Sequence, residues 1–579
     1  MSTLKKGEHF MTKRKLCALL LAAGLMSTVI LGGCGGDDSN SKTSAVSTAP
    51  VVKSNIPEDG GFKTVSYESS KDKFRTFYEI FPYSFYDSDG NGKGDLKGIT
   101  QHLDYLNDGD PKTTEDLGID GIWLTPIMQS PSYHKYDVQD YYTVDEIFGT
   151  NDDFKTLLDE AHKRGINVII DLVINHSSSK HEWFRKALDE LKEGKTDGYA
   201  QYYHFEKGNN IDGWSKANVD DWYYESNFVS EMPDLNLKNP ELREELKKIT
   251  KYWLDMGVDG FRLDAVLWFE SVDGKYGQHD NDSSIEDLKW LYDYAKSVKE
   301  DVYMVGECWT DSTTIAEYYK SGVDSFFNFK GQGSKGSFNL SINGSDAAGF
   351  VSFLESWQGQ LLKNNPNAID AKFLSNHDTV RSAEFITNDT KKRLAAAMYI
   401  LAPGNPFIYY GEEIEMDGVN PPDPDVRRGM LWSTTDADGY VKKIPGGTKM
   451  EDEPTISVES SLKNDQSLMS FYKRAIVLRN QNPEIARGTI KALTFEDKKE
   501  TAGFISTYKD SSVLVMYNLG ETSATVTIPS SDFKVNEMRG YILAHNANDA
   551  LYRETPYDDS IKLDGQTLTM PAHSVFVLK

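Results

Sequence analysis

The sequence predicts an α/β fold: a (β/α)8 TIM barrel with an inserted domain after strand 3 and a C-terminal all-β domain. Three observations lead to this prediction. After residue 75, helical stripes of apolar residues alternate with short β-rich runs. One long polar and aromatic interval, between His176 and about Asn239, interrupts the alternation. From about Gly488 onward, short strands at turn-punctuated intervals replace it.

Four helical stripes define the repeated unit. They are predicted at residues 152–164, 242–253, 288–298 and 391–401. Thr150 and Asn151 can cap the first of these helices, and Gly165 can end it. Each stripe precedes a run that suits a parallel strand buried on both faces. Eight candidate strands result, beginning near Phe77, Ile119, Ile166, Val258, Val302, Val323, Lys372 and Pro406.

We divide the chain accordingly. Residues 1–33 form a signal peptide, 34–70 a flexible tether rich in small polar residues, and 71–487 the catalytic barrel. The inserted domain covers about 177–239, and a β-sandwich domain covers 488–579. The last domain either binds polysaccharide or caps the barrel. We favour capping, because no tryptophan follows Trp432.

Composition narrows the class of partner. The 579 residues carry a formal net charge of -26, which repels phosphate backbones and excludes nucleic-acid binding. A neutral partner such as a sugar suits this charge. Three cysteines are too few for a disulfide framework, and we expect Cys308 to be a reduced structural thiol. We expect a monomer.

The N-terminus has the features of a targeting segment. Basic residues at 13–15 precede an apolar run from Leu16 to Leu31. The run ends in Leu31-Gly32-Gly33-Cys34, which resembles the lipobox of bacterial lipoproteins. That resemblance implies lipidation at Cys34 and an extracytoplasmic protein anchored to the bacterial cell membrane. The alternative is a plain secretory signal and a secreted protein.

Acidic residues recur at the carboxyl ends of the predicted strands, where barrel enzymes place their chemistry. They are Asp171, Asp264, Glu307 and Asp378, after the third, fourth, fifth and seventh strands. A single acid at such a position is often a cap or an ion-pair partner. Four of them favour glycoside transfer, which needs one ionised and one protonated carboxyl group. Arg262 points to the same side of its strand as Asp264 and can keep it ionised.

These stretches resemble the α-amylase superfamily, glycoside hydrolase family 13. The similar segments are Asp171–His176, Gly260–Ala265, Val305–Glu307, Phe373–Asp378, Met232–Asn236 and Gly404–Glu413. The match runs in order from about residue 75 to 485. It implies a retaining mechanism with Asp264 as nucleophile, Glu307 as general acid/base and Asp378 as transition-state stabiliser. The residues alone could not choose retention, which depends on the separation of the carboxyl groups.

The resemblance also implies a set of substrate-binding residues. The segment Tyr133–Asp137 is similar to the one that carries the family's stacking tyrosine, which corresponds to Tyr136. Together, the residues expected to bind substrate are Tyr136, Asp137, His176, Arg262 and His377.

The run from Asp87 to Asp95 alternates oxygen ligands with glycine, a pattern that suits Ca²⁺. It is not an EF-hand, because the twelfth position is Gly98 rather than Glu. A turn without metal is the alternative. The run resembles the first βα loop of oligo-1,6-glucosidase-like members. That resemblance implies a calcium site formed by Asp87, Asp89, Asn91, Asp95 and the carbonyl of Lys93.

One segment departs from the family pattern. Where many α-amylases follow the nucleophile with Ala-x-Lys-His, this chain has Ala265, Val266, Leu267 and Trp268. The resemblance therefore does not support a second calcium site near the inserted domain, nor some of the family's contacts on the leaving side of the substrate.

The predicted function is hydrolysis of α-1,4 bonds in starch or maltodextrins by an endo-acting α-amylase. Ala265 resembles α-1,4-acting members, whereas valine there is associated with α-1,6 activity. Alternatives are an oligosaccharide-acting α-glucosidase or oligo-1,6-glucosidase, and a transglycosylase or trehalose-forming isomerase. A non-catalytic glucan-binding relative is disfavoured, because all three acids are present.

Overall fold

The computed structural model describes residues 57–579, apart from a few single positions between 58 and 69 and residues 209, 211, 436–438, 449–454 and 546–559. The predicted signal peptide and Cys34 lie outside the described residues. Within the described part of the chain, no helix combines the length and the apolar character needed to cross a bilayer.

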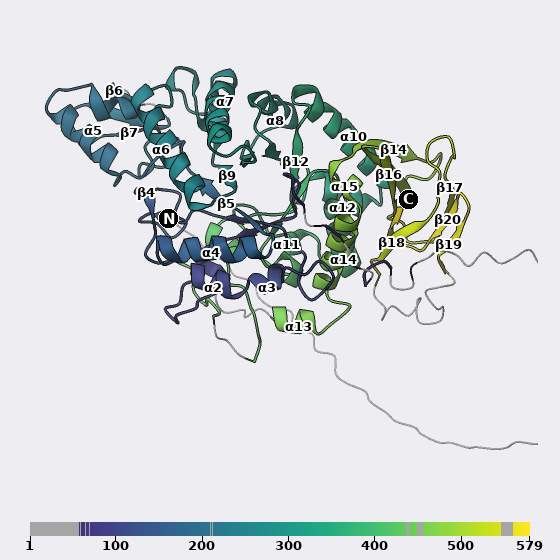
Figure 1. The fold of residues 1–579 in the computed structure, drawn as a ribbon. Coiled ribbons are helices and arrows are strands. Elements are labelled where there is room, and N and C mark those ends of the chain that lie inside the picture. The colour runs from purple at the N-terminus through teal and green to yellow at the C-terminus, as the bar shows by residue number, and fades with distance from the viewer. Residues whose placement is uncertain are drawn as a thin grey trace, which may run out of the picture. The chain divides into compact units, whose positions relative to one another are not determined.

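Eight parallel strands close into a barrel, in which each strand pairs with the next one along the chain and the last pairs with the first (Figure 1). The strands are β1 (Phe77–Ile80), β2 (Gly121–Leu124), β5 (Asn167–Leu172), β9 (Gly260–Leu263), β10 (Tyr303–Gly306), β11 (Ser325–Phe327), β12 (Ile369–Lys372) and β13 (Asn405–Tyr409). Nearly all of their residues are buried, as expected for strands covered on both faces. The predicted fold class is confirmed.

The predicted position of the seventh strand along the sequence was wrong. β12 ends at Lys372, where we expected it to begin. Its charged residues Asp370 and Lys372 hide the apolar pattern, yet both are buried. The carboxylate of Asp370 accepts a hydrogen bond of 2.7 Å from the Trp357 indole, which satisfies part of this buried charge.

The helices alternate with the barrel strands, as predicted. The main ones are α4 (Asn151–Lys163), α6 (Pro240–Met256), α7 (Asn281–Val298), α10 (Ala347–Asn364), α12 (Asp389–Ile400) and α14 (Leu468–Gln481). α4 begins with a capping box between Thr150 and Asp153, and its apolar stripe is buried. α6 ends at Gly257, whose φ of 118° favours glycine. Because the barrel strands are parallel, their carboxyl ends lie at one face of the barrel.

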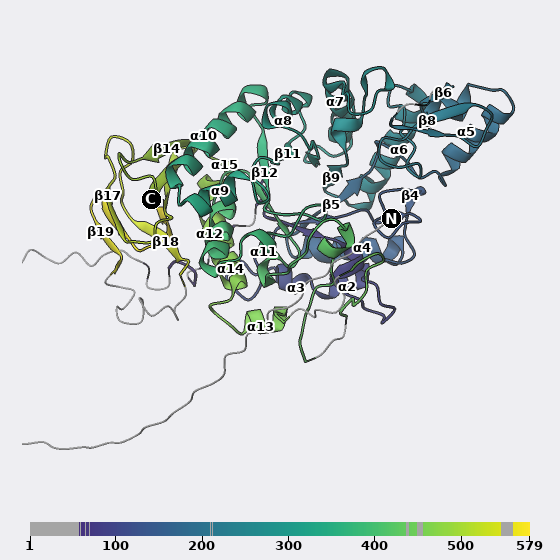
Figure 2. The same ribbon diagram turned by 180° about the vertical axis from the view of Figure 1, so that it is seen from behind.

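The interval after β5 holds separate structure. It contains α5 (Glu182–Lys192) and an antiparallel sheet of β6 (Phe205–Lys207), β8 (Trp222–Glu225) and β7 (Trp214–Lys216). These elements cluster together in both ribbon views (Figures 1 and 2). After β2, a short pair of strands, β3 (Met128–Gln129) and β4 (Asp140–Val144), holds the loop with Tyr136.

The C-terminal region is all-β, as predicted. One sheet has the order β14 (Thr489–Thr494), β15 (Thr501–Tyr508), β16 (Ser511–Asn518), β21 (Ser574–Leu578) and β18 (Met538–Leu543). The other has the order β17 (Ala524–Thr527), β20 (Thr567–Met570) and β19 (Lys562–Asp564). Both sheets contribute to one hydrophobic cluster, which includes Met516 and Phe576 from the first and Leu568 from the second.

Candidate active site

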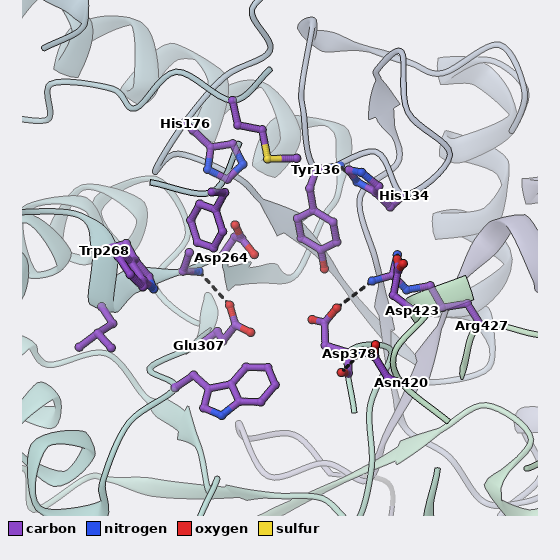
Figure 3. Close-up of a pocket in the computed structure, with 15 residues that line it drawn as sticks. His134, Tyr136, His176, Asp264, Trp268, Glu307, Asp378, Asn420, Asp423 and Arg427 are labelled. Atoms are coloured by element: carbon purple, nitrogen blue, oxygen red, sulfur yellow. Dashed lines mark hydrogen bonds and ion pairs between the residues drawn. The ribbon is translucent and has the colours of Figure 1, made fainter. Parts of the chain in front are cut away.

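Three of the four acidic residues predicted from strand ends meet at one cavity of about 470 Å³. Asp264 follows β9, Glu307 follows β10, and Asp378 lies in the loop after β12. Figure 3 shows the three carboxylates facing the same space. The cavity is lined by His134, Tyr136, His176, Phe228, Met232, Asp264, Ala265, Leu267, Trp268, Glu307, Trp309, Asp378, Asn420, Asp423 and Arg427.

A single buried guanidinium links three of the acids. Arg262 Nη1 lies 2.7 Å from Asp171 Oδ1 and 2.5 Å from Asp264 Oδ1, and Nη2 lies 3.1 Å from Glu307 Oε2. Its side chain is fully buried, so these ion pairs are little screened by solvent. Asp171 is also fully buried behind the cavity and does not line it. Asp171 therefore supports Arg262 rather than facing the cavity.

Glu307 lies in surroundings that favour its protonated form. Burial raises the pKa of Glu307 to about 7, because the nearby cation Arg262 offsets only part of the desolvation and Asp264 opposes ionisation. The backbone N–H of Ala265 donates to Glu307 Oε2 at 3.0 Å. Ala265 has a φ of 50°, a left-handed conformation that is uncommon for alanine. This turn aims the N–H of the residue after Asp264 at the neighbouring acid.

Asp378 is held in the opposite state. Burial alone would raise its pKa, but His377 and Arg427 outweigh that effect and hold the pKa of Asp378 well below its ordinary value. His377 Nε2 lies 2.9 Å from one carboxylate oxygen and Arg427 Nη2 lies 2.8 Å from the other. Its side chain keeps 28% exposure, toward the cavity.

The predicted substrate-binding residues divide into two groups. Tyr136 and His176 line the cavity. Arg262 and His377 lie behind its wall, fully buried, and contact the acids. Asp137 is not among the lining residues: its carboxylate accepts hydrogen bonds from Ser130 and Ser132 within its own loop. The expectation that Asp137 contacts substrate directly is therefore not supported by its position.

Aromatic side chains form one side of the cavity. Phe228 and Trp268 lie with ring centroids 5.6 Å apart, and Tyr276 lies 5.4 Å beyond Trp268. Trp309, two residues after Glu307, also lines the cavity and stacks on Phe329 at 4.8 Å. Phe228, Tyr276 and Trp309 are 44%, 51% and 49% exposed. Exposed rings in and beside the cavity suit the apolar faces of sugar rings.

The loop at 87–95 brings oxygen ligands together. Carboxylate oxygens of Asp87, Asp89 and Asp95 lie within 4.8 Å of one another. Asn91 lies in the same loop, with its side-chain oxygen accepting from the N–H of Lys93 at 2.9 Å. Asp95 also caps helix α2 (Leu96–Gln101) by accepting from the Gly98 N–H at 2.8 Å. Hard oxygen donors in this arrangement fit a calcium ion.

Near the inserted domain, where the sequence does not support a second calcium site, the acidic residues are arranged differently from those of the 87–95 loop. Buried carboxylates of Glu225 and Asp234 lie there, and the Asn227 amide donates to both, at 3.0 and 2.6 Å. Burial raises the pKa of Asp234 well above its ordinary value. An amide thus lies between the two carboxylates.

Comparison with known proteins identifies the chain. Residues 79–488 match the family model of the alpha-amylase catalytic domain. The chain belongs to the alpha-amylase family. It is therefore a glycoside hydrolase of that family.

Alpha-amylase-family relatives resemble most of the chain. Alpha-amylase 3 of Dictyoglomus thermophilum is 38% identical over 462 residues, covering 78% of this chain and 85% of that protein. An oligo-1,6-glucosidase of Parageobacillus thermoglucosidasius is 29% identical over 532 residues, covering 78% and 91%. The solved structure of Eubacterium rectale Amy13B matches with a TM-score of 0.79 and 39% identity, covering 89% of this chain and 97% of that one.

This alpha-amylase-family site includes residues that sequence reasoning missed. Glu79 lies near the end of β1, and the strand-end rule could have found it. Asn420, Asp423 and Arg427 come from the irregular segment after β13, where no periodicity gives a signal. Arg427 Nη1 lies 2.8 Å from Asp423 Oδ2, which fixes the guanidinium beside Asp378.

Proposed function

We propose that the protein is a retaining, endo-acting α-amylase that cleaves α-1,4-glucosidic bonds of starch and maltodextrins. Asp264 is the nucleophile, Glu307 the general acid/base and Asp378 the transition-state stabiliser. The observation that carries the proposal is the opposite electrostatic setting of Glu307 and Asp378 around one cavity. Arg262, which contacts both Asp264 and Glu307, keeps these two groups close, and a short separation favours retention.

In the first step, the Asp264 carboxylate attacks the anomeric carbon of the bound glucosyl unit. The bond to the leaving oxygen breaks, and Glu307 gives its proton to that oxygen. Arg262 pairs with the Asp264 carboxylate and orients it for this attack. Asp378 remains a carboxylate and stabilises the positive charge that develops on the sugar ring.

In the second step, Glu307 is a carboxylate and takes a proton from an incoming water molecule. The oxygen of that water attacks the anomeric carbon, and the ester bond to Asp264 breaks. Asp264 leaves as a carboxylate and Glu307 is protonated again. Two inversions give net retention of the anomeric configuration.

The α-1,4 preference rests on two supports. Ala265 follows the nucleophile, as in members that act on α-1,4 bonds. The relative of Dictyoglomus thermophilum, at 38% identity, is named an alpha-amylase. The exposed aromatic rings in and beside the cavity suit a substrate of several sugar units, which favours an endo-acting enzyme.

An oligosaccharide-acting α-glucosidase or oligo-1,6-glucosidase is the second candidate. The loop at 87–95 and the segment Met232–Asn236 favour it, as does the relative of Parageobacillus thermoglucosidasius at 29% identity. A transglycosylase or trehalose-forming isomerase would use the same three acids and differ in how readily water reaches the intermediate. A non-catalytic glucan-binding relative is the weakest alternative, because the three acids are present.

Product analysis separates these candidates. The full chain is incubated with maltoheptaose, soluble starch, pullulan, isomaltose and maltose. We expect short maltooligosaccharides from starch and maltoheptaose, initially in the α-configuration. Isomaltose cut faster than maltoheptaose would instead establish the oligo-1,6-glucosidase, and maltose converted mainly to trehalose would establish the isomerase. Asp264→Asn should lower kcat by about 10⁴-fold or more, and full activity in this variant would overturn the mechanism.

We also propose one structural calcium ion, held by Asp87, Asp89, Asn91, Asp95 and the Lys93 carbonyl. Removing it with a chelator should lower the melting temperature by on the order of 2–5 °C, since an ion bound only by the folded state stabilises it. Asp89→Asn should abolish most of this shift. Asp110→Asn, in another exposed Asx turn, is the control. An unchanged melting temperature after chelation would contradict the proposal.

The proposed location is extracytoplasmic, with Cys34 lipidated and anchored in the bacterial cell membrane, and secretion as the alternative. The support is the lipobox-like sequence Leu31-Gly32-Gly33-Cys34. Cys34→Ser should release the protein from the membrane fraction, and retention there would contradict lipidation. We further propose a monomer, which sedimentation of the mature protein would test.

A further inference from the structure

A chain of three side chains, of which two are buried behind the cavity and the third lines it, connects the first strand with the loop after the seventh. Glu79 lies on β1 and is 1% exposed, and His377 is fully buried in the loop after β12. Glu79 Oε1 lies 2.6 Å from His377 Nδ1 and accepts the His377 backbone N–H at 3.2 Å. On the other side of the ring, His377 Nε2 lies 2.9 Å from Asp378 Oδ2. The histidine thus lies between two carboxylates.

Such a ring must carry both protons to satisfy both neighbours. A neutral imidazole has one N–H donor and one bare nitrogen, and the bare nitrogen would face a carboxylate oxygen. Burial alone would lower the pKa of His377, but Asp378 and Glu79 outweigh it and raise the pKa to about 9. The Tyr136 hydroxyl oxygen lies 2.7 Å from Nε2 and can accept a hydrogen bond from the same Nε2–H that faces Asp378. The hydroxyl itself donates to Asp171 at 3.3 Å.

We propose that Glu79 is a positioning residue of the active site, whose carboxylate holds His377 in the doubly protonated form that keeps Asp378 oriented and ionised. The inference rests on the proposed role of Asp378 as transition-state stabiliser. Glu79 does not line the cavity and so acts through His377.

The other groups around His377 leave this role to Glu79. Arg427 donates through Nε to the His377 backbone carbonyl at 2.9 Å and pairs with Asp378, so it does not supply a negative charge to the ring. Asp171 reaches the ring through the Tyr136 hydroxyl and is itself paired with Arg262. The ring also packs against Trp123, which carries no charge.

Glu79→Gln tests the inference with little change of shape. The glutamine oxygen can still accept from Nδ1, but the negative charge is lost, so the pKa of His377 falls. A neutral His377 would then turn a bare Nε2 toward Asp378. We expect variant and wild type to be within about threefold of each other near pH 5, where His377 is still charged. The ratio of their kcat/KM values on maltoheptaose should fall about tenfold between about pH 5 and pH 8, the effect expected when the pKa of His377 falls by about two units. The loss should appear in kcat more than in KM.

Glu413→Gln is the matched control. Glu413 is also buried beside β1, where its carboxylate accepts from Tyr78 and Tyr105 at 2.8 and 2.5 Å. The Glu413→Gln substitution removes a buried carboxylate that does not contact His377. The ratio of this variant's kcat/KM to that of the wild type should therefore not depend on pH. A constant ratio for Glu79→Gln, at whatever level, would overturn the inference. Failure of the proposed function would show separately, as no cleavage of maltoheptaose by the wild type.

A second measurement does not depend on whether Glu79→Gln folds. In the wild type, His377 should give low-field ¹H NMR signals from both the Nδ1 and the Nε2 protons that persist above about pH 8, assigned by their loss in His377→Asn. Glu79→Asp, which retains the charge, should keep both signals. A wild-type His377 that loses its proton near the ordinary value of about 6.5 would overturn the inference.

Discussion

Two carboxyl groups that follow β10 and β12 line the same cavity, and their surroundings shift their pKa values in opposite directions. Glu307, after β10, is 10% exposed and shares the cation Arg262 with two other acids. Asp378, after β12, is 28% exposed and contacts two cations, His377 and Arg427, each of which also pairs with one further carboxylate. One group keeps a proton near neutral pH and the other does not. The difference shows that neighbours and burial, not residue type, divide acid from stabiliser.

The sharpest test of this comparison changes each acid in turn. Glu307→Gln should lower kcat/KM on maltoheptaose by about 10²–10⁴-fold, the usual contribution of a general acid. On a dinitrophenyl maltooligosaccharide, bond cleavage should be much less affected, because that leaving group needs no proton. Asp378→Asn should lose activity on both substrates, because developing charge on the sugar ring does not depend on the leaving group. Burst and steady-state rates measure this.

The same pair of substrates shows what would break the comparison. A Glu307→Gln variant that loses equal activity on both substrates would not behave as one lacking only an acid. An Asp378→Asn variant with normal activity on the dinitrophenyl substrate would place Asp378 outside stabilisation. The wild type assayed on both substrates is the reference for each ratio.

Arg427→Met should remove one of the two cations that keep Asp378 ionised and leave the surroundings of Glu307 unchanged. Without this cation the pKa of Asp378 rises, so the carboxylate becomes protonated at higher pH and the acid limb of kcat/KM moves upward. We expect an activity loss of about 10²-fold at neutral pH, comparable to removing one preorganised donor at a charged transition state. The neighbouring Arg428 pairs with Asp417 instead, so Arg428→Met is the control. An unmoved acid limb in Arg427→Met would contradict this assignment.

The wild-type pH profile tests the Glu307 side. Its raised pKa means that the acid form persists to about pH 7 and is lost as the pH rises further. We therefore expect kcat/KM to decline tenfold per pH unit on the alkaline side, with an apparent pKa near 7. The profile on the dinitrophenyl substrate should lack this limb. An alkaline limb that persists there would assign the titration to another group.

The sequence indicates the acids at the strand ends but does not indicate the residues that come from irregular segments, and the difference has physical reasons. Acids at strand ends are visible because a buried strand is a regular apolar run and the site follows it directly. β12 was misplaced because its charged Asp370 and Lys372 are buried within the strand. Glu79 follows the same rule as the four acids and was overlooked. Arg427 comes from an irregular segment, so only the folded chain reveals that it neutralises Asp378.

The aromatic cluster of Phe228, Trp268 and Tyr276 gives the smallest expected effect, and we assign it to the leaving side of the substrate. Trp268 follows Asp264 by four positions and lies between Phe228 and Tyr276. Trp268→Ala should lower kcat/KM on maltoheptaose by about 2–10-fold, the range of a stacking contact of roughly 0.5–1.5 kcal/mol. The loss should be smaller on a substrate whose leaving group is a single sugar too short to reach the ring. Trp222→Ala, which removes a half-buried ring that packs with Lys207 outside the cavity, is the control. Equal losses on long and short leaving groups would mean that Trp268 supports the loop after β9 rather than the leaving chain.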